Sequence, residues 1–390
     1  GALALAGFLH RRTLSRKQAV QLAKERLALV PTNRMHILGG GALGTLWAAH
    51  CPAATLLLRE GTTALQASRL RLRVHRLRAG EAAGPVDEAL EACVRLEPSS
   101  GSATTPIGTL VIATKAYGAA AALEGVRSRL QSDAVVVLLC NGALSLADSL
   151  QLPAGGALLV ATTTHGAWLH PPRQEGLREV QHAGRGTTWV GPLLPLRAGG
   201  GGGGGGAARV AGVPEVASSS SAELAAARFA AAGLGAVVEG GGQTSRRLWL
   251  KLAANAVLNP LTALWNVRNG EVLRRPDGRR IAADVCAEIA QVCAAAPPAA
   301  ATPSPSAREL EAFVEDCASE NADNWSSMHQ DLHHGRRTEV EHLNGWVARR
   351  ARELGTRAEA NDALAEQMRR AEAAKGQTGG GGEWRVERTN

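Results

Sequence analysis

The chain has 390 residues, of which 45% are apolar and 20% are charged, and this is a globular composition with room for two domains. Its longest purely apolar run, Ala134 to Cys140, is far shorter than the roughly 20 residues that cross a bilayer, so no membrane span is predicted. The net charge of +8 comes from scattered basic residues, and one Tyr and three Phe offer few rings for base stacking. We therefore expect no nucleic-acid partner, and a small anionic ligand explains the charge equally well.

The first segment, residues 1–34, is a basic N-terminal extension. Its first 24 residues hold Arg11, Arg12, Arg16, Lys17 and Lys24 and no acidic residue. This bias is typical of an organellar transit peptide, and a basic solvated helix explains it equally well. We expect an intracellular protein that stays in the cytoplasm or, if the segment is a transit peptide, enters a mitochondrion or plastid.

Cysteine spacing favours the same kind of compartment. The six cysteines lie far apart and form no CxxC pair, which is typical of reduced thiols buried as small hydrophobic side chains. They are Cys51, Cys93, Cys140, Cys286, Cys293 and Cys317.

Residues 35–240 carry the pattern of an α/β domain. Short β-branched runs alternate with segments rich in Ala and Leu, which is typical of a parallel sheet with crossover helices. We predict a Rossmann-type, doubly wound parallel sheet with a flexible Gly/Ser insert over residues 199–221. The expected strands are His36–Leu38, Thr55–Leu58, Leu110–Ala113, Val135–Leu139, Leu158–Thr163 and Thr188–Val190.

A glycine-rich loop follows the first expected strand and opens an apolar helix from Ala42 to His50. In a GxGxxG loop the first glycine permits a tight turn, the second lets the backbone approach a pyrophosphate, and the third allows close packing of helix and strand. The helix N-terminus adds free N–H groups and a partial positive charge. The predicted cofactor-binding residues here are Gly39, Gly40, Gly41, Ala42, Leu43 and Gly44.

The residue at the end of the second expected strand indicates which dinucleotide binds. An NAD site usually has an acidic residue there, about 20 residues after the loop, to accept from the ribose 2′-hydroxyl. Here the strand Thr55–Leu58 ends at Arg59, whose guanidinium would pair with a 2′-phosphate. We therefore predict NADP(H), although Glu60 follows directly and an exposed strand-end arginine is the alternative.

After about Gln243 the strand pattern ends, and helical spacing takes over. We predict an all-α domain over residues 243–376 and a flexible glycine-rich tail over residues 377–390. The expected helical segments are Leu248–Leu258, Arg279–Ala294, Ala307–Asn321, Val340–Leu354 and Asn361–Ala374.

One of these helical segments has a narrow polar stripe. Between Leu248 and Asn259 the only polar residues are Lys251, Asn255 and Asn259, spaced at i, i+4 and i+8 on one helix face. A solvent face would be wider and richer in charge, so the stripe is expected to line a polar cleft. Lys251 there is a candidate proton donor, since desolvation lowers a lysine pKa, although it could also polarise a carbonyl by charge alone.

Farther along, small polar groups and a carboxylate join the candidates. Asn324 and Ser327 supply hydrogen-bonding groups, and Glu339 stands at an apparent helix start, where N-terminal helix charge is an alternative explanation. His329 and His333 have the i, i+4 spacing of metal ligands, but no third ligand lies within sequence reach, so no metal site is predicted.

Together these motifs resemble the ketopantoate reductase family over roughly residues 35–374, in order and in approximate spacing. The resemblance implies a reductase that converts 2-dehydropantoate to (R)-pantoate with NADPH, a step toward pantothenate and coenzyme A. The matching motifs are the Gly39–Gly44 loop, Thr114-Lys115-Ala116, Asn141-Gly142, Thr162 to His165, Lys251 to Asn255, Asn259 to Ala263, Asn269-Gly270, Ser326-Ser327-Met328 and Thr338-Glu339-Val340.

By that resemblance Lys251 would be the general acid, and Glu339 would complete the cleft as a catalytic and cofactor-binding residue. The cofactor would also meet Arg59, Lys115, Asn141 and Ala167. The substrate would be bound by Asn141, Asn255, Asn259, Asn269, Asn324 and Ser327.

Two other functions are compatible with the sequence. A reductase of another branched 2-oxo acid would share all these motifs, because the apolar residues that line the substrate pocket cannot be identified from one sequence. A non-catalytic NADP(H)-binding sensor is the other, and the intact polar set argues against it. The expected partner is a small 2-oxo acid, and the chain is expected to be a monomer or a homodimer.

Overall fold

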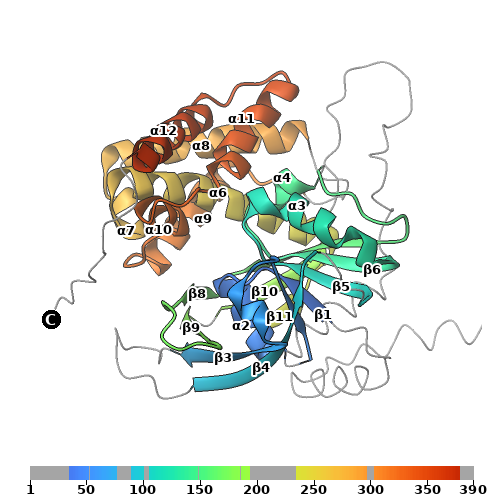
Figure 1. Ribbon diagram of the computed structural model, residues 1–390. Coiled ribbons are helices and arrows are strands. Elements are labelled where there is room, and N and C mark those ends of the chain that lie inside the picture. The colour runs from blue at the N-terminus through green and yellow to red at the C-terminus, as the bar shows by residue number, and fades with distance from the viewer. Residues whose placement is uncertain are drawn as a thin grey trace, which may run out of the picture.

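The computed structural model describes residues 35–51, 53–76, 89–100, 105–147, 149–184, 186–193, 234–296 and 303–377. A large twisted sheet forms one part of the molecule, and a bundle of helices from the second half of the chain packs against one end of it (Figure 1). The predicted extension, residues 1–34, and the predicted insert, residues 199–221, lie outside the described residues, as does all of the predicted tail, residues 377–390, beyond residue 377.

The sheet has 11 strands in the order β11-β10-β7-β6-β5-β1-β2-β4-β3-β9-β8. Strands β7, β6, β5, β1, β2 and β4 are parallel, while β10, β3 and β8 each pair antiparallel to a neighbour. The first six strands in the chain are β1 (Met35–Leu38), β2 (Thr55–Leu58), β3 (Arg69–Arg76), β4 (Ala89–Pro98), β5 (Ile107–Ile112) and β6 (Leu130–Leu138). The others are β7 (Ala157–Thr163), β8 (Gly166–Leu169), β9 (Leu177–Gly184), β10 (Thr188–Pro192) and β11 (Ala236–Val238).

Both faces of the central strands are covered, as the doubly wound prediction requires. In β1, Ile37 packs into the core beneath helix α2 (Ala42–His50), whereas Leu38 packs into the core on the opposite face. That opposite core includes α3 (Ala116–Val126) and α4 (Ala143–Leu146) and continues into the helical region. Successive strand residues point to opposite faces, so a strand covered on both sides must be apolar throughout.

Strands β3, β4, β8 and β9 were not predicted. They extend the sheet beyond β2 and bring it round helix α2, which contacts all four of them (Figure 1). The strand β3 alternates, with Leu70, Leu72 and Val74 buried and arginines between them. One face therefore joins the core, and the other meets solvent.

The helical region is built around the 25-residue helix α6 (Gly241–Trp265). It is longer at both ends than the predicted segment Leu248–Leu258, and it continues through Pro260. Proline has no N–H to donate to the carbonyl four residues earlier, so a helix normally kinks or ends there. Here the side chain of Asn344 donates to that carbonyl, of Ala256, at 2.9 Å.

The other predicted helices form with small shifts, except that the segment Val340–Leu354 is broken. A 3₁₀ turn, Val340–His342, precedes helix α11 (Asn344–Glu353), because Leu343 between them leaves the helical conformation. The remaining helices are α7 (Asn269–Val272), α8 (Pro276–Ala295), α9 (Ala307–Glu320), α10 (Ser327–His333) and α12 (Glu359–Gln377). Short 3₁₀ turns also occur at Thr63–Gln66 and Arg127–Arg129.

None of the helices within the described ranges combines the length and apolar character that a membrane crossing requires. The six cysteines, all inside those ranges, are free thiols.

Candidate active site

The glycine-rich loop between β1 and α2 has the geometry that its sequence predicts. Gly39 has φ +119°, a conformation that side chains with a Cβ rarely adopt. A Cβ on Gly44 would lie 2.0 Å from the carbonyl oxygen of Gly39, so the helix can approach the turn only with glycine there. A Cβ on Gly41 would meet nothing within 4 Å, so the first turn of α2 faces open space.

These features fit a dinucleotide. The N-cap residue of α2 is Gly41, which has no side chain to cap the helix. The first N–H groups of α2 are therefore available to an anion. The hydroxyl of Thr114, beyond the end of β5, is buried and has no hydrogen-bond partner among the described residues. Arg59 is exposed at the end of β2, directly after Leu58.

Lys251 projects from α6 toward the carboxyl end of β7. Its ammonium donates to the carbonyl of Thr163 at 3.2 Å. Burial lowers the pKa of Lys251, and the nearby Cys140 and Glu339 raise it by a smaller amount. The protonated lysine therefore gives up its proton more readily than a solvated lysine does.

Glu339 connects the helical region to the carboxyl ends of β5 and β6. One of its oxygens accepts the backbone N–H of Ala116 at 2.8 Å, and the other accepts the side-chain amide of Asn141 at 3.2 Å. Glu339 is 5% exposed, so these hydrogen bonds satisfy a buried carboxylate. Asn141 and Glu339, which are 198 positions apart, thus meet beside Lys251.

Lys115 lies next to this group and pairs with a residue that the sequence analysis missed. Its ammonium is 2.5 Å from a carboxylate oxygen of Asp331 in α10 and 3.7 Å from Glu339. Burial disfavours the charge on Lys115, but the two carboxylates outweigh it and raise its pKa. Arg336 binds the other oxygen of Asp331 at 3.0 Å.

The rest of the polar stripe runs along α6 away from Lys251. Asn255 is half-buried and Asn259 is buried, one and two turns farther on. The backbone carbonyl of Asn259 lies 3.5 Å from the hydroxyl of Ser326, which in turn accepts from Thr262 at 2.7 Å. These bonds hold the start of α10, and hence Ser327, against the far end of the stripe.

Asn269 and Asn324 also come together, through the backbone. The N–H of Asn269 donates to the carbonyl of Asn324 at 3.1 Å, and the Asn269 amide donates to the carbonyl of Asn321 at 3.2 Å. The side-chain oxygen of Asn269 is buried, and within the described ranges it accepts no hydrogen bond. Ser327 and Asn324 are exposed.

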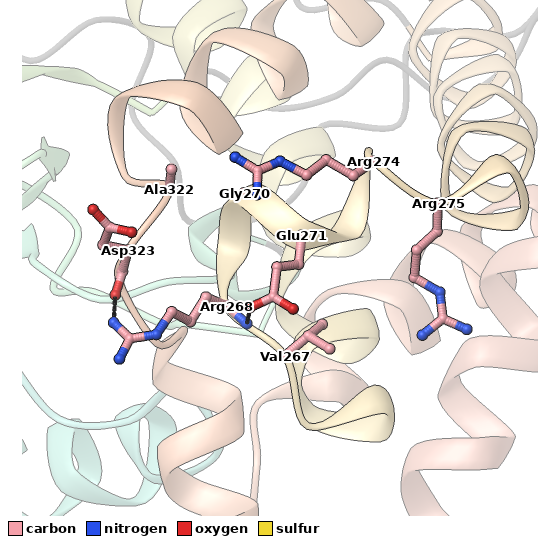
Figure 2. Close-up of a pocket in the computed structure, with 8 residues that line it drawn as sticks. All are labelled: Val267, Arg268, Gly270, Glu271, Arg274, Arg275, Ala322 and Asp323. Atoms are coloured by element: carbon pink, nitrogen blue, oxygen red, sulfur yellow. Dashed lines mark hydrogen bonds between the residues drawn. The ribbon is translucent and has the colours of Figure 1, made fainter. Parts of the chain in front are cut away.

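A pocket of about 500 Å³ lies beside these asparagines, on the side of α7, and Lys251 does not line it. Figure 2 shows Arg268 extending to Asp323, where its guanidinium donates to the backbone carbonyl. The lining residues are Val267, Arg268, Gly270, Glu271, Arg274, Arg275, Ala322 and Asp323. Because the glycine loop and the polar stripe lie elsewhere, this pocket adjoins the candidate site without forming it.

Three other sequence candidates have clear positions. Ala167 is half-buried in β8, which packs against α2. His329 stacks on Trp325 with ring centroids 4.0 Å apart and shares a hydrogen bond with Asn266, and burial lowers its pKa to about 4. His333 lies edge-on to His329. The His329 ring is thus held by packing against Trp325 and His333 and by the Asn266 amide.

The site residues predicted from the sequence did not include Asp331, Ser326 or Thr163, although Ser326 and Thr163 lie in motifs that carry the family resemblance. Each acts on a partner far away in the chain, as Asp331 does on Lys115, 216 positions earlier. Ser326 alone carried a local signal, because a serine directly before a helix is a common N-cap, and here its hydroxyl accepts the N–H of His329.

Comparison with known families gives two successive matches along the chain. The profile described as ketopantoate reductase PanE/ApbA matches residues 35–195. The profile described as ketopantoate reductase PanE/ApbA C terminal matches residues 243–372.

Individual proteins agree with these matches over most of the chain. The 2-dehydropantoate 2-reductase of Archaeoglobus fulgidus is 31% identical over 350 residues, which cover 87% of this chain and 98% of that protein. The Vibrio cholerae enzyme of the same name is 28% identical over 339 residues, 85% of this chain and 96% of that protein.

Solved structures show the same fold. The ketopantoate reductase of Ralstonia eutropha JMP134 has a TM-score of 0.65 at 25% identity, covering 88% of this chain and 99% of that one. D-mandelate dehydrogenase, solved with NADH and anilino(oxo)acetate, has a TM-score of 0.68 at 20% identity with the same coverage. The second likeness concerns the fold alone.

Proposed function

Because the chain belongs to the ketopantoate reductase family and is an oxidoreductase, we propose that it reduces 2-dehydropantoate to (R)-pantoate with NADPH. The product would enter pantothenate and coenzyme A biosynthesis. We assign cofactor binding to a domain of residues 35–240 and most substrate contacts to a domain of residues 243–376.

The observation that carries this proposal is the position of Lys251. Its ammonium lies at the carboxyl end of β7, near Asn141 and Glu339, where the two regions of the chain meet. In α/β folds of this kind, ligands bind outside the carboxyl ends of the strands. A proton donor placed there suits a reaction on a bound dinucleotide and a small acid.

Lys251 acts as the general acid in this proposal. When bound, NADPH supplies the hydride that adds to the keto carbon. As the carbon–oxygen double bond becomes single, the electron pair moves to oxygen, and the Lys251 ammonium gives that oxygen a proton to complete the alcohol. The resulting amine regains a proton from water, and the lowered pKa of Lys251 helps the first transfer.

The amides and hydroxyl around the lysine bind the substrate. Asn255 and Asn259 continue the face of α6 that begins at Lys251, so they can contact an extended polar molecule along that face. Ser327 and Asn324 hold the carboxylate. The side-chain oxygen of Asn269 accepts no hydrogen bond from the described residues and can accept one from a substrate hydroxyl. Asn141, which bonds to Glu339 beside the lysine, also orients the substrate.

The cofactor would be held by the glycine loop, by Lys115 and by Ala167. We assign recognition of the 2′-phosphate to Arg59, because it is the cation at the end of β2, where an NAD-specific chain would carry an acid. Asn141 and Glu339, which already bond to each other, would face the nicotinamide.

An assay of NADPH oxidation with a panel of 2-oxo acids tests this function. We expect kcat/KM for 2-dehydropantoate to exceed that for 2-oxoisovalerate and for phenylglyoxylate by roughly tenfold or more, the discrimination that substrate-specific polar contacts provide. The variant Lys251→Ala, assayed in parallel, should lose the activity. Preference for another acid would contradict the substrate assignment, and absence of turnover with every acid would contradict the function.

A further inference from the structure

Arg178 occupies an unusual place for a cation, on the core-facing side of strand β9. In the register of the sheet it pairs with Leu72 of β3, which is buried, and it shares its face with buried Val180. Its neighbour Glu179 points to the opposite face, where it bonds to His75 at 2.9 Å. Strand alternation therefore directs Arg178 toward helix α2 and the loop that precedes it.

The guanidinium of Arg178 reaches the glycine loop itself. One of its terminal nitrogens donates to the carbonyl of Gly40 at 3.1 Å. A Cβ on Gly40 would lie 2.5 Å from that nitrogen and 2.7 Å from the side chain of Leu58. Gly40 thus leaves room for the arginine, which lies on the side of the loop nearest the end of β2.

The charge on Arg178 has no counter-ion among the residues that the structure describes. There it forms no ion pair with a carboxylate, and its only hydrogen bond is the one to Gly40. Burial lowers its pKa, and no acidic neighbour in the described ranges offsets this effect. A partly buried cation without a partner is costly, and an anion that binds beside it would remove much of that cost.

We propose that Arg178 is a second arginine of the 2′-phosphate site and acts with Arg59 to select NADPH over NADH. This inference rests on the proposed NADPH-dependent function for the identity of the ligand. Arg178 is 138 positions from Gly40 of the glycine loop in the sequence. It comes close to the loop because the sheet curls around α2 and places β9 next to that helix.

The position favours the 2′-phosphate over the pyrophosphate. A pyrophosphate binds at the helix N-terminus, which here is the open side at Gly41. The ribose 2′ position lies by the end of β2, which is Leu58 followed by Arg59. Arg178 lies with Leu58 at Gly40, so its charge falls on the ribose side of the loop.

Calorimetric titration of the full chain with two probes tests the proposal without turnover. Adenosine 2′,5′-bisphosphate carries the 2′-phosphate, and adenosine 5′-monophosphate lacks it. We expect Arg178→Gln to weaken binding of the bisphosphate by about tenfold or more and to change binding of the monophosphate less than about twofold, because only one probe pairs with the lost charge. Arg178→Lys should restore part of the loss.

Controls separate this effect from loss of charge or of the fold. Arg71→Gln removes an exposed arginine of the neighbouring strand and should leave both affinities unchanged. Glutamine keeps a donor for the Gly40 carbonyl. If the neutral variant does not fold, Arg178→Lys, which keeps the charge, is tested in its place. The proposal would be overturned if Arg178→Gln weakened binding of both probes equally, or if it changed binding of neither probe. A wild-type chain that prefers the bisphosphate but does not reduce 2-dehydropantoate would contradict the proposed function and leave this inference standing.

Discussion

At Lys251, the proposed general acid, the requirement for catalysis would oppose the requirement for stability. The ammonium is drawn out of water to reach the Thr163 carbonyl, and burial lowers its pKa as a result. The same desolvation that makes the proton easier to transfer makes the charged form costly in the folded protein.

Replacing Lys251 should therefore lower the activity and raise the stability of the folded protein. We expect Lys251→Met to lower kcat by about 10²–10⁴, which is the usual contribution of a positioned acid. The variant should also melt at a higher temperature near neutral pH, because it removes a buried charge. Steady-state kinetics and thermal unfolding on the same preparation measure both effects. Near-normal kcat with a raised KM would mean that Lys251 anchors the substrate carboxylate.

The sign of the pH dependence follows from the lowered pKa. Between the folded-state pKa and the ordinary value of 10.5, the unfolded chain binds more protons than the folded one, so the wild type gains stability as pH rises. The advantage of Lys251→Met should be fully present below that interval and should vanish above it. A stability difference that stays constant with pH would contradict this account.

At the scale of elements, α6 carries the polar stripe through a proline because another helix completes its hydrogen bonds. Pro260 leaves the carbonyl of Ala256 without its helical donor, and the Asn344 amide takes that place. Asn344 is fully buried and also donates to Asn361, so the region is fixed by one polar network. Asn255 directly precedes this turn and Asn259 lies within it, so the turn sets their spacing along the helix.

We expect Asn344→Leu to lower the free energy of unfolding by about 2 kcal/mol or more, since it strands buried acceptors. The cost should fall by roughly 1 kcal/mol when Pro260→Ala is also present, because the new N–H can donate to Ala256. Urea unfolding of the four proteins of the cycle measures this coupling. If the cost of Asn344→Leu is the same in both backgrounds, the amide does not act through the proline.

How far the sequence predicts the fold depends on whether a pattern is local. The loop from Gly39 to Gly44 and the stripe from Lys251 to Asn259 could be predicted, because turn geometry and helix periodicity are short-range. The strand Arg69–Arg76 alternates clearly and could have been found too. The meeting of Asn141 with Glu339, or of Arg178 with Gly40, could not, because no local period encodes how distant segments dock.

At the scale of the whole molecule, a small set of polar residues joins the helical region to the sheet at the candidate site. Glu339 bonds to Ala116 and Asn141, and Asp331 pairs with Lys115, so each link runs from the helical region to the strand ends. These contacts surround the position assigned to the cofactor. The contacts that join the two regions are therefore also contacts of the candidate site.

The Lys115–Asp331 pair should contribute measurably to that docking. The carboxylate is 5% exposed but the lysine side chain is 37% exposed, so solvent screening limits the expected coupling to about 1 kcal/mol. A double-mutant cycle with Lys115→Met and Asp331→Asn measures it, and it isolates the pair from the separate bond between Asp331 and Arg336. The coupling should shrink in high salt.

The matched control is the pair Arg349–Glu341, which lies at 2.8 Å within the helical region alone. Its coupling should be smaller, because both side chains are more exposed. The pKa of Lys115 is raised, so its stabilising charge is present below 10.5 and is lost only as pH rises through the higher folded-state value. If the pair holds the regions together, its removal should also increase the radius of gyration measured by small-angle scattering, whereas the control variants should not. An unchanged radius together with zero coupling would show that Glu339 and apolar packing suffice to dock the two regions.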